Sequence, residues 1–280
     1  MGLVSDFGAT FYGASSFNAD ISGWNTASAT IFHDMFHGAT SFAPASLNNW
    51  VTDKVFSFGQ MFAAATNFNA EISDWRTNNA LTFQGMFTNA TSFNQPIPWG
   101  ESTANVLDID QMFLFTNFNH DLSSWNTMSV TTMQLFLARN SAFNSPMFQD
   151  VSSVESMSGA FLSAISFNQN LSGWNVSKVT NMESLFFNAM SYAETLCWDL
   201  KNLVVVSKMF CGSQANFDTK CVTSPSLIAS ARQGCAFANA NINPVDDSDS
   251  IDETSFAWGV GCSVHVVLLL VGSILAPLVM

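Results

Sequence analysis

Charged side chains are scarce in this chain: they make up 10% of its 280 residues, against the roughly 25% typical of soluble domains. The eight lysines and arginines are scattered, and the formal net charge is −13. Proteins that bind nucleic acids carry a basic patch that neutralises phosphate groups. The sequence therefore argues against DNA or RNA as a partner.

Residues suited to catalysis or metal binding are equally few. The chain has four histidines, and it contains no Ser/His/Asp order, no glycine-rich phosphate loop and no EF-hand loop. His33 and His37 lie four residues apart with Asp34 between them, a spacing that would place both imidazoles on one face of a helix. We expect that face to be solvated, because the neighbouring Met35 and Phe36 take the buried positions.

Paired carboxylates occur at Asp108 and Asp110 and again at Asp246 and Asp247. We expect them in turns or in a linker, without a partner acid in a pocket. The sequence thus predicts no enzyme, no cofactor and no metal site.

Cysteine is absent before residue 197 and then forms a cluster: Cys197, Cys211, Cys221 and Cys235. Two disulfides closing a terminal cap would suit an oxidising compartment. A zinc site is the alternative, but the cluster lacks a C-x₂-C pair. All three pairings are open, and we favour Cys211–Cys221 because these residues flank the last Phe-x₆-Phe turn.

One short sequence motif recurs along the chain, as in "TFYGASSF", "MFHGATSF" and "MFTNATSFN". One aromatic position recurs every 24–26 residues: Phe17, Phe42, Phe68, Phe93, Phe118, Phe143, Phe167 and Tyr192. A tryptophan follows in every unit except the one that contains Phe143, and a ladder of Val, Ala and Leu from Val4 to Leu203 has the same period. Three ladders with one period identify a repeat array.

Each repeat unit has two halves. In Val179–Tyr192 the apolar residues fall at i, i+3, i+6 and i+7, which predicts a short helix or 3₁₀ turn with one buried face. The second half, such as "FNQNLSGWN", predicts a brief strand around "LSGW" flanked by turns. One unit cannot bury its aromatic residues alone, so we expect the units to stack, Phe on Phe and Trp on Trp.

The pattern MFxxAxSFNxxISxWN…VTxMxxMF resembles the 26-residue repeat of bacterial surface proteins and lipoproteins, which is related to the BspA-like leucine-rich repeats. Ser166–Phe186 and Asn117–Phe136 match it most closely, and the resemblance covers about Val4 to Phe217. It implies an α/β, leucine-rich-repeat-like solenoid of about eight coils, displayed outside the cell for adhesion or interaction. The family supplies no catalytic residues.

The C-terminal part differs in composition from the repeats. Residues 239–256 are rich in Asp, Ser and Asn and predict a disordered acidic linker. Residues 257–280 are apolar and long enough to span a bilayer. A small-residue site, a polar spacer and a hydrophobic tail are typical of a GPI-attachment signal, with these candidate attachment residues: Asp247, Ser248, Asp249 and Ser250. A retained single-pass helix is the alternative, and a cytosol-facing tail anchor is a third option.

The other end is in phase with the repeat from Val4 onward, without an apolar signal region. Either a cap and a signal peptide lie upstream of this sequence, which we favour, or the first coil is frayed. The predicted organisation is a repeat solenoid (1–217), a Cys-containing cap (218–238), the linker (239–256) and the hydrophobic membrane segment or GPI signal (257–280).

Asn89, Asn170 and Asn175 begin Asn-X-Ser/Thr sequons and are glycosylation candidates if the chain is secreted. Taken together, the sequence predicts a membrane-anchored, surface-displayed and non-catalytic repeat protein that binds a protein or a polysaccharide. A passive spacer or coat component of the cell surface is the alternative.

Overall fold

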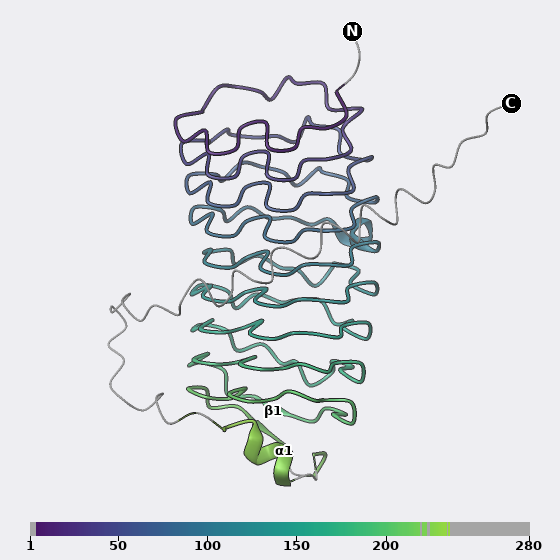
Figure 1. The fold of residues 1–280 in the computed structure, drawn as a ribbon, viewed down its shortest axis with the longest axis vertical. Coiled ribbons are helices and arrows are strands. Elements are labelled where there is room, and N and C mark those ends of the chain that lie inside the picture. The colour runs from purple at the N-terminus through teal and green to yellow at the C-terminus, as the bar shows by residue number, and fades with distance from the viewer. Residues whose placement is uncertain (1–3, 219, 223–224, 234, 236–280) are drawn as a thin grey trace, which may run out of the picture. The chain divides into compact units, whose positions relative to one another are not determined.

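The computed structural model describes residues 4–218, 220–222, 225–233 and 235. The chain divides into two units, Met1–Asn239 and Ala240–Met280, and all described residues belong to the first. Within this unit the chain winds in successive coils that lie one above the next (Figure 1). Isolated parallel bridges join equivalent residues of neighbouring coils, 24–26 residues apart, at Asp6, Ile31, Ser57, Thr82, Asp108, Thr132, Ser156, Asn181 and Val205. The repeat nature of the chain is thereby confirmed.

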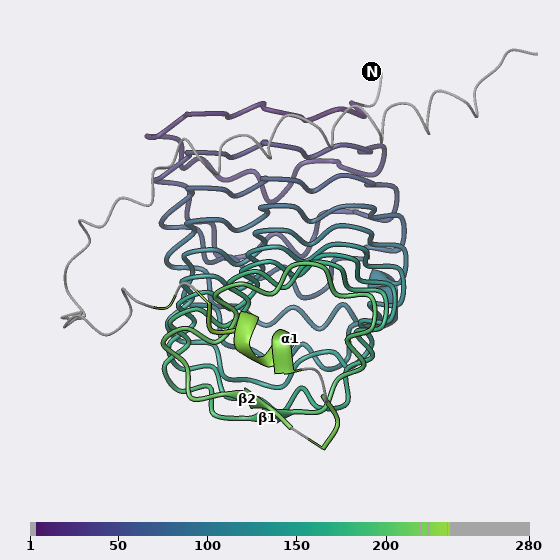
Figure 2. The same ribbon diagram turned by 60° about the horizontal axis from the view of Figure 1, so that its bottom comes forward.

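Regular secondary structure is sparse in the described residues. The 3₁₀ helix η1 spans Gly100–Thr103, the two-residue strands β1 (Thr195–Leu196) and β2 (Asn216–Phe217) pair in parallel, and the helix α1 spans Pro225–Ser230. In Figure 2 the helix α1 lies across the end of the last coils. The coils themselves are built from turns.

The first half of each unit forms two consecutive turns, each closed by an N–H bond to the carbonyl three residues earlier, where the sequence predicted a short helix or a 3₁₀ turn. In the unit that begins at Asn181, the Leu185 N–H donates to Met182 O at 3.2 Å. Ser184 lies between them in the left-handed region (φ 54°), and its N–H donates to the next coil, to Ser207 O at 2.9 Å. A left-handed residue interrupts a helix, so alternate N–H groups bond across coils rather than along one helix.

The predicted strand around "LSGW" is present in only some of the units. Trp174 N–H donates to Leu171 O at 3.0 Å, so Leu171–Trp174 is a turn that leaves both end residues buried. The bridge between Ser46 and Glu71 and the strand β1 lie beside the equivalent residues Leu47, Ile72 and Leu196, whereas the other bridges lie next to the first buried residue of each unit. Spacing i, i+3 directs two apolar side chains inward from a turn as well as from a helix, so the pattern alone does not fix the backbone conformation.

The core consists of aromatic columns that run along the stack. Phe36, Phe62 and Phe87 are fully buried, with ring centroids 5.6 and 5.8 Å apart and nearly parallel planes. Trp50 and Trp75 stack in the same way at 6.3 Å. In the unit without Trp, Phe148 takes the tryptophan position and stacks on Trp174 at 6.0 Å.

Two ladders of polar side chains join the coils outside the aromatic core. In the first, an exposed Asn side-chain oxygen accepts the N–H of the equivalent residue one coil later, as Asn94 Oδ1 does from Asn119 and Asn119 Oδ1 does from Asn144. In the second, a buried Thr hydroxyl exchanges hydrogen bonds with the next coil, as Thr26 does with the N–H and C=O of Val51. These ladders explain why Asn follows the recurring Phe and why Thr follows the Trp.

No helix among the described residues is sufficiently long and apolar to cross a membrane. The predicted linker (239–256) and hydrophobic segment (257–280) lie outside the described residues.

Candidate functional site

One face of the stack is built from the paired turns, and we call it the turn face. In the second coil it comprises His33, Asp34, His37 and Gly38, and in every other described coil the equivalent residues. Two of the four positions have positive φ in each coil: Asp34 and Gly38 here, at 56° and 70°. Such a residue holds its neighbours' side chains outward while the intervening Phe and Met point into the core.

The turn face varies in chemical character from coil to coil, whereas the core position beside it is apolar in every described coil. The position after each bridge is apolar and at most 7% exposed: Phe7, Phe32, Phe58, Phe83, Ile109, Met133, Met157, Met182 and Val206. The next residue, on the turn face, changes at almost every step: Gly8, His33, Gly59, Gln84, Asp110, Gln134, Ser158, Glu183 and Ser207. The fold thus constrains the inward position and leaves the outward one free.

The histidine pair predicted on a helix lies instead on these turns. His33 Nε2 and His37 Nδ1 each lie 2.9 Å from a different carboxylate oxygen of Asp34. Hydrogen bonding to Asp34 raises the pKa of His33; burial opposes ionisation of Asp34, but the two imidazoles lower its pKa to about 2. Because both imidazoles are directed at one carboxylate, the group acts as a local crosslink, and across the described residues no cluster of His, Cys, Asp or Glu is arranged to hold a metal ion.

Asp108 and Asp110 form a second cluster of titratable groups on this side of the stack. Asp108 Oδ1 accepts the Asp110 N–H at 2.8 Å, and Asp110 Oδ1 accepts the Thr132 hydroxyl of the next coil at 2.6 Å. Burial raises the pKa of both carboxyl groups, and the nearby Asp110 charge helps to bring that of Asp108 to about 7. The sequence predicted that both residues lie in turns without a partner acid in a pocket. In the structure the period of the coil places Thr132 and Gln134 of the next coil beside them.

We expect this pair to make stability depend on pH. Between 3.8, the ordinary pKa of Asp108, and about 7, its value in the folded chain, the folded state binds more protons than the unfolded state, so stability falls as pH rises through that window. The free energy of unfolding is measured in urea at pH 5 and at pH 8. Asp108→Asn should make the difference between these two values smaller by about 1–3 kcal/mol. The control is Asp121→Asn, which has the same kind of turn hydrogen bond at an exposed site. Equal pH dependence in wild type and Asp108→Asn would contradict the assignment.

The four clustered cysteines form two disulfides, as predicted, but the favoured pairing Cys211–Cys221 is wrong. The bonds are Cys197–Cys221 and Cys211–Cys235, each joining residues 24 apart. That separation is one coil, so each disulfide joins residues stacked above one another, with Cα atoms 5.2 and 5.1 Å apart. Cys211 and Cys221, ten residues apart in sequence, lie at different places around the coil.

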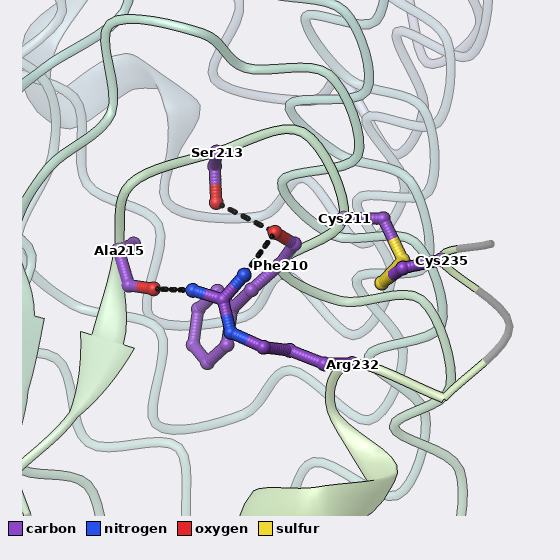
Figure 3. The surroundings of a disulfide bond; sticks show 6 residues. All are labelled: Phe210, Cys211, Ser213, Ala215, Arg232 and Cys235. Atoms are coloured by element: carbon purple, nitrogen blue, oxygen red, sulfur yellow. Dashed lines mark hydrogen bonds between the residues drawn. A yellow bond between two sulfur atoms is a disulfide. The ribbon is translucent and has the colours of Figure 1, made fainter. Parts of the chain in front are cut away.

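The second disulfide lies beside an arginine that closes the end of the stack (Figure 3). Arg232, just after α1, donates to Phe210 O at 3.2 Å and to Ala215 O at 2.7 Å, with its guanidinium 5.9 Å from the Phe210 ring centroid. Charge-assisted bonds of this kind satisfy carbonyls that no further coil covers. The cap is therefore held by the disulfide Cys211–Cys235 and by the two hydrogen bonds of Arg232.

The three predicted glycosylation residues, Asn89, Asn170 and Asn175, are all exposed. Asn170 Oδ1 and Asn175 Oδ1 accept the N–H two residues onward, at 2.9 and 3.1 Å, while Asn89 is a left-handed residue of the turn face. The structure does not bring the three together. The predicted attachment residues Asp247, Ser248, Asp249 and Ser250 and the pair Asp246 and Asp247 lie outside the described residues.

One family model matches the chain, in three overlapping stretches: residues 5–116, 98–149 and 109–223. Its description is "Mycoplasma protein of unknown function, DUF285". The chain belongs to this family. No curated protein sequence and no solved structure matches it. The DUF285 match runs from the first coil to residue 223 and so includes Cys197–Cys221, the first of the two disulfides.

Proposed function

We propose that this DUF285 chain is a non-catalytic interaction module, a leucine-rich-repeat-like solenoid related to the BspA-like surface repeats, that binds a protein or polysaccharide through its turn face. The observation that carries the proposal is the contrast between core positions that are apolar in every described coil and turn-face positions that differ in size and charge. A stack held by its core and ladders is free to change its outward residues, which is how repeat proteins build extended binding surfaces.

The chemistry of the turn face suits a large ligand contacted over several coils. The amide of Gln84 and the carboxyl group of Glu183 are partly exposed and offer hydrogen bonds. Phe115 adds an aromatic side chain that is 42% exposed, with the Arg139 guanidinium 4.9 Å from its ring centroid. Aromatic and arginine side chains are the residues that most often anchor interfaces.

We further propose that the module stands outside the cell. Two disulfides in the C-terminal cap support an oxidising compartment. The membrane attachment would come from residues 257–280, through a GPI anchor or a retained single-pass helix. Release from intact cells by a phosphatidylinositol-specific phospholipase distinguishes the two.

A passive spacer or coat component is the second candidate. It is favoured by the Asn and Thr ladders, which bond neighbouring coils whatever the turn face carries. A spacer would show no saturable ligand on glycan or protein arrays, whereas an interaction module would.

The experiment that tests binding compares two triple variants of the full chain against the array ligand. The turn-face variant is Gln84→Ala, Phe115→Ala and Glu183→Ala, which we expect to weaken the Kd at least tenfold by removing contacts on three coils. The control variant changes three exposed side chains away from that face: Asn78→Ala, Ser123→Ala and Lys178→Ala. Equal losses, or loss in the control alone, would place the binding surface elsewhere.

A further inference from the structure

The edge of the first coil that faces away from the stack carries a row of carbonyl groups. In the second coil, four alternate carbonyls accept N–H groups of the first coil at 2.7–3.0 Å: those of Ile31, His33, Met35 and His37. The equivalent carbonyls of the first coil are those of Asp6, Gly8, Thr10 and Tyr12, and no described residue donates a hydrogen bond to them. Wherever two coils are in contact, these carbonyls of the later coil accept the N–H groups of the earlier one.

The aromatic columns are uncovered at the same edge. Trp24 is 37% exposed, whereas Trp50, one coil further along, is 3% exposed. Phe11 and Phe17 are half-buried at positions that are fully buried in later coils. The edge therefore combines unpaired acceptors with an apolar surface of the kind that a coil normally covers.

The opposite end of the stack is closed. There the N–H groups of Lys208 and Phe210 donate to Gln233 O and Ala231 O of the cap, at 3.2 and 3.1 Å. The donor row of the last coil is thus occupied at these positions. Within the described residues, a second copy of the chain offers no complete donor row: its first-coil donors are paired with its second coil, and Lys208 and Phe210 of its last coil are paired with its cap.

We propose that this edge of the first coil is a docking surface for one further coil of the same 25-residue repeat. The segment that supplies the further coil must have unpaired backbone N–H groups along the side that faces Asp6–Tyr12. The interface continues the contact that the chain makes between each pair of its own coils. Four alternate N–H groups would meet the carbonyls from Asp6 to Tyr12. Trp24 Nε1 would donate to the added coil, as Trp50 Nε1 donates to Ile21 O at 3.1 Å.

Specificity for this repeat follows from the same contacts. The Asn25 N–H is equivalent to the Val51 N–H, which donates to the threonine hydroxyl oxygen of the preceding coil, Thr26 Oγ1, at 2.8 Å. The occupant must therefore carry Thr two residues after its Trp, as well as inward Phe residues that stack on Phe11 and Phe17. An arbitrary edge strand would supply the N–H groups but neither the threonine nor the aromatic columns.

The test adds one coil to the full chain. A copy of residues 55–79, which contains Phe58, Phe62, Phe68, Trp75 and Thr77, is placed directly before Val4. Trp24→Phe is also made in the chain with the added coil and in the chain without it. The difference between each protein and its Trp24→Phe variant gives the fluorescence of Trp24. We expect the iodide quenching constant of Trp24 to fall severalfold and its emission to move to shorter wavelength, because the new coil covers the indole.

The matched control carries Phe58→Ser, Phe62→Ser and Phe68→Ser in the added copy only. It has the same length and the same backbone donors, but it cannot continue the aromatic columns, so Trp24 should stay accessible. Unchanged quenching with the unmodified copy would overturn the proposal, as would equal protection by the control copy.

Discussion

Deletion of Phe83–Asp108, one whole period, should leave a folded but shorter stack, whereas deletion of Phe83–Gln95, half a period, should abolish cooperative folding. The whole-period deletion joins Thr82 to Ile109, so a bridge residue is still followed by an inward apolar residue. The half-period deletion instead places Pro96 after Thr82. Every inward column beyond the junction is then displaced around the coil.

The contacts that the whole-period deletion needs are already present elsewhere in the chain. Trp75 would meet Trp125 as Trp99 now does at 5.6 Å, and Asn69 would meet Asn119 as Asn94 now does at 2.9 Å. Because each coil contacts only its neighbours, one fewer interface lowers stability without changing the remaining ones. Urea unfolding followed by tryptophan fluorescence measures both variants. Similar unfolding midpoints for the two deletions would contradict the stacking of equivalent residues.

The period and the buried residues could be predicted from the sequence because burial repeats with the coil. The Phe, Trp and Val ladders each mark a position that faces inward in every unit, and they lie in the core with few exceptions, such as Val4 and Trp24 at the open edge. Periodicity reports which way a side chain points, and it does so whatever backbone conformation carries it. For that reason it identified the repeat array but left a short helix and a 3₁₀ turn as alternatives for the first half of each unit.

The turns themselves depend on backbone angles that the residues do not reveal. Left-handed conformations occur at Leu135, Arg139 and Lys208, as well as at Gly13 and Gly38. Only Gly, Asn and Asp favour that region intrinsically, so Leu and Arg at these positions gave no signal. Their conformation is maintained by the neighbouring coil: Arg139 N–H donates to Leu162 O and Leu135 N–H to Ser158 O.

The disulfide pairing and the acidic pair were missed for a related reason. Cys211 and Cys221 are near one another in the sequence, whereas the disulfides and the side-chain contacts of Asp110 join residues about one period apart. Applying the 24-residue separation to the cysteines selects Cys197–Cys221 and Cys211–Cys235 at once. The same step places Thr132 and Gln134 beside Asp108 and Asp110.

Trp125→Ala is expected to lower the free energy of unfolding by roughly 3–5 kcal/mol. The indole is 5% exposed, stacks on Trp99 at 5.6 Å, and donates from Nε1 to Ile97 O at 3.0 Å. Removing it leaves a cavity in the tryptophan column and a buried carbonyl without its donor, and both effects destabilise the fold. Linear extrapolation from urea unfolding gives the value.

Two further variants separate the causes of this loss. Trp24→Ala changes the same column at its open edge, where the indole is 37% exposed, and should cost about 1 kcal/mol or less. Trp125→Phe keeps a ring in the column, as Phe148 does naturally beneath Trp174, but loses the bond to Ile97 O. It should therefore cost about 1–2 kcal/mol. If Trp125→Ala cost no more than Trp24→Ala, the indole would be exposed in solution, and the tryptophan column would have to be considered a binding surface rather than a core.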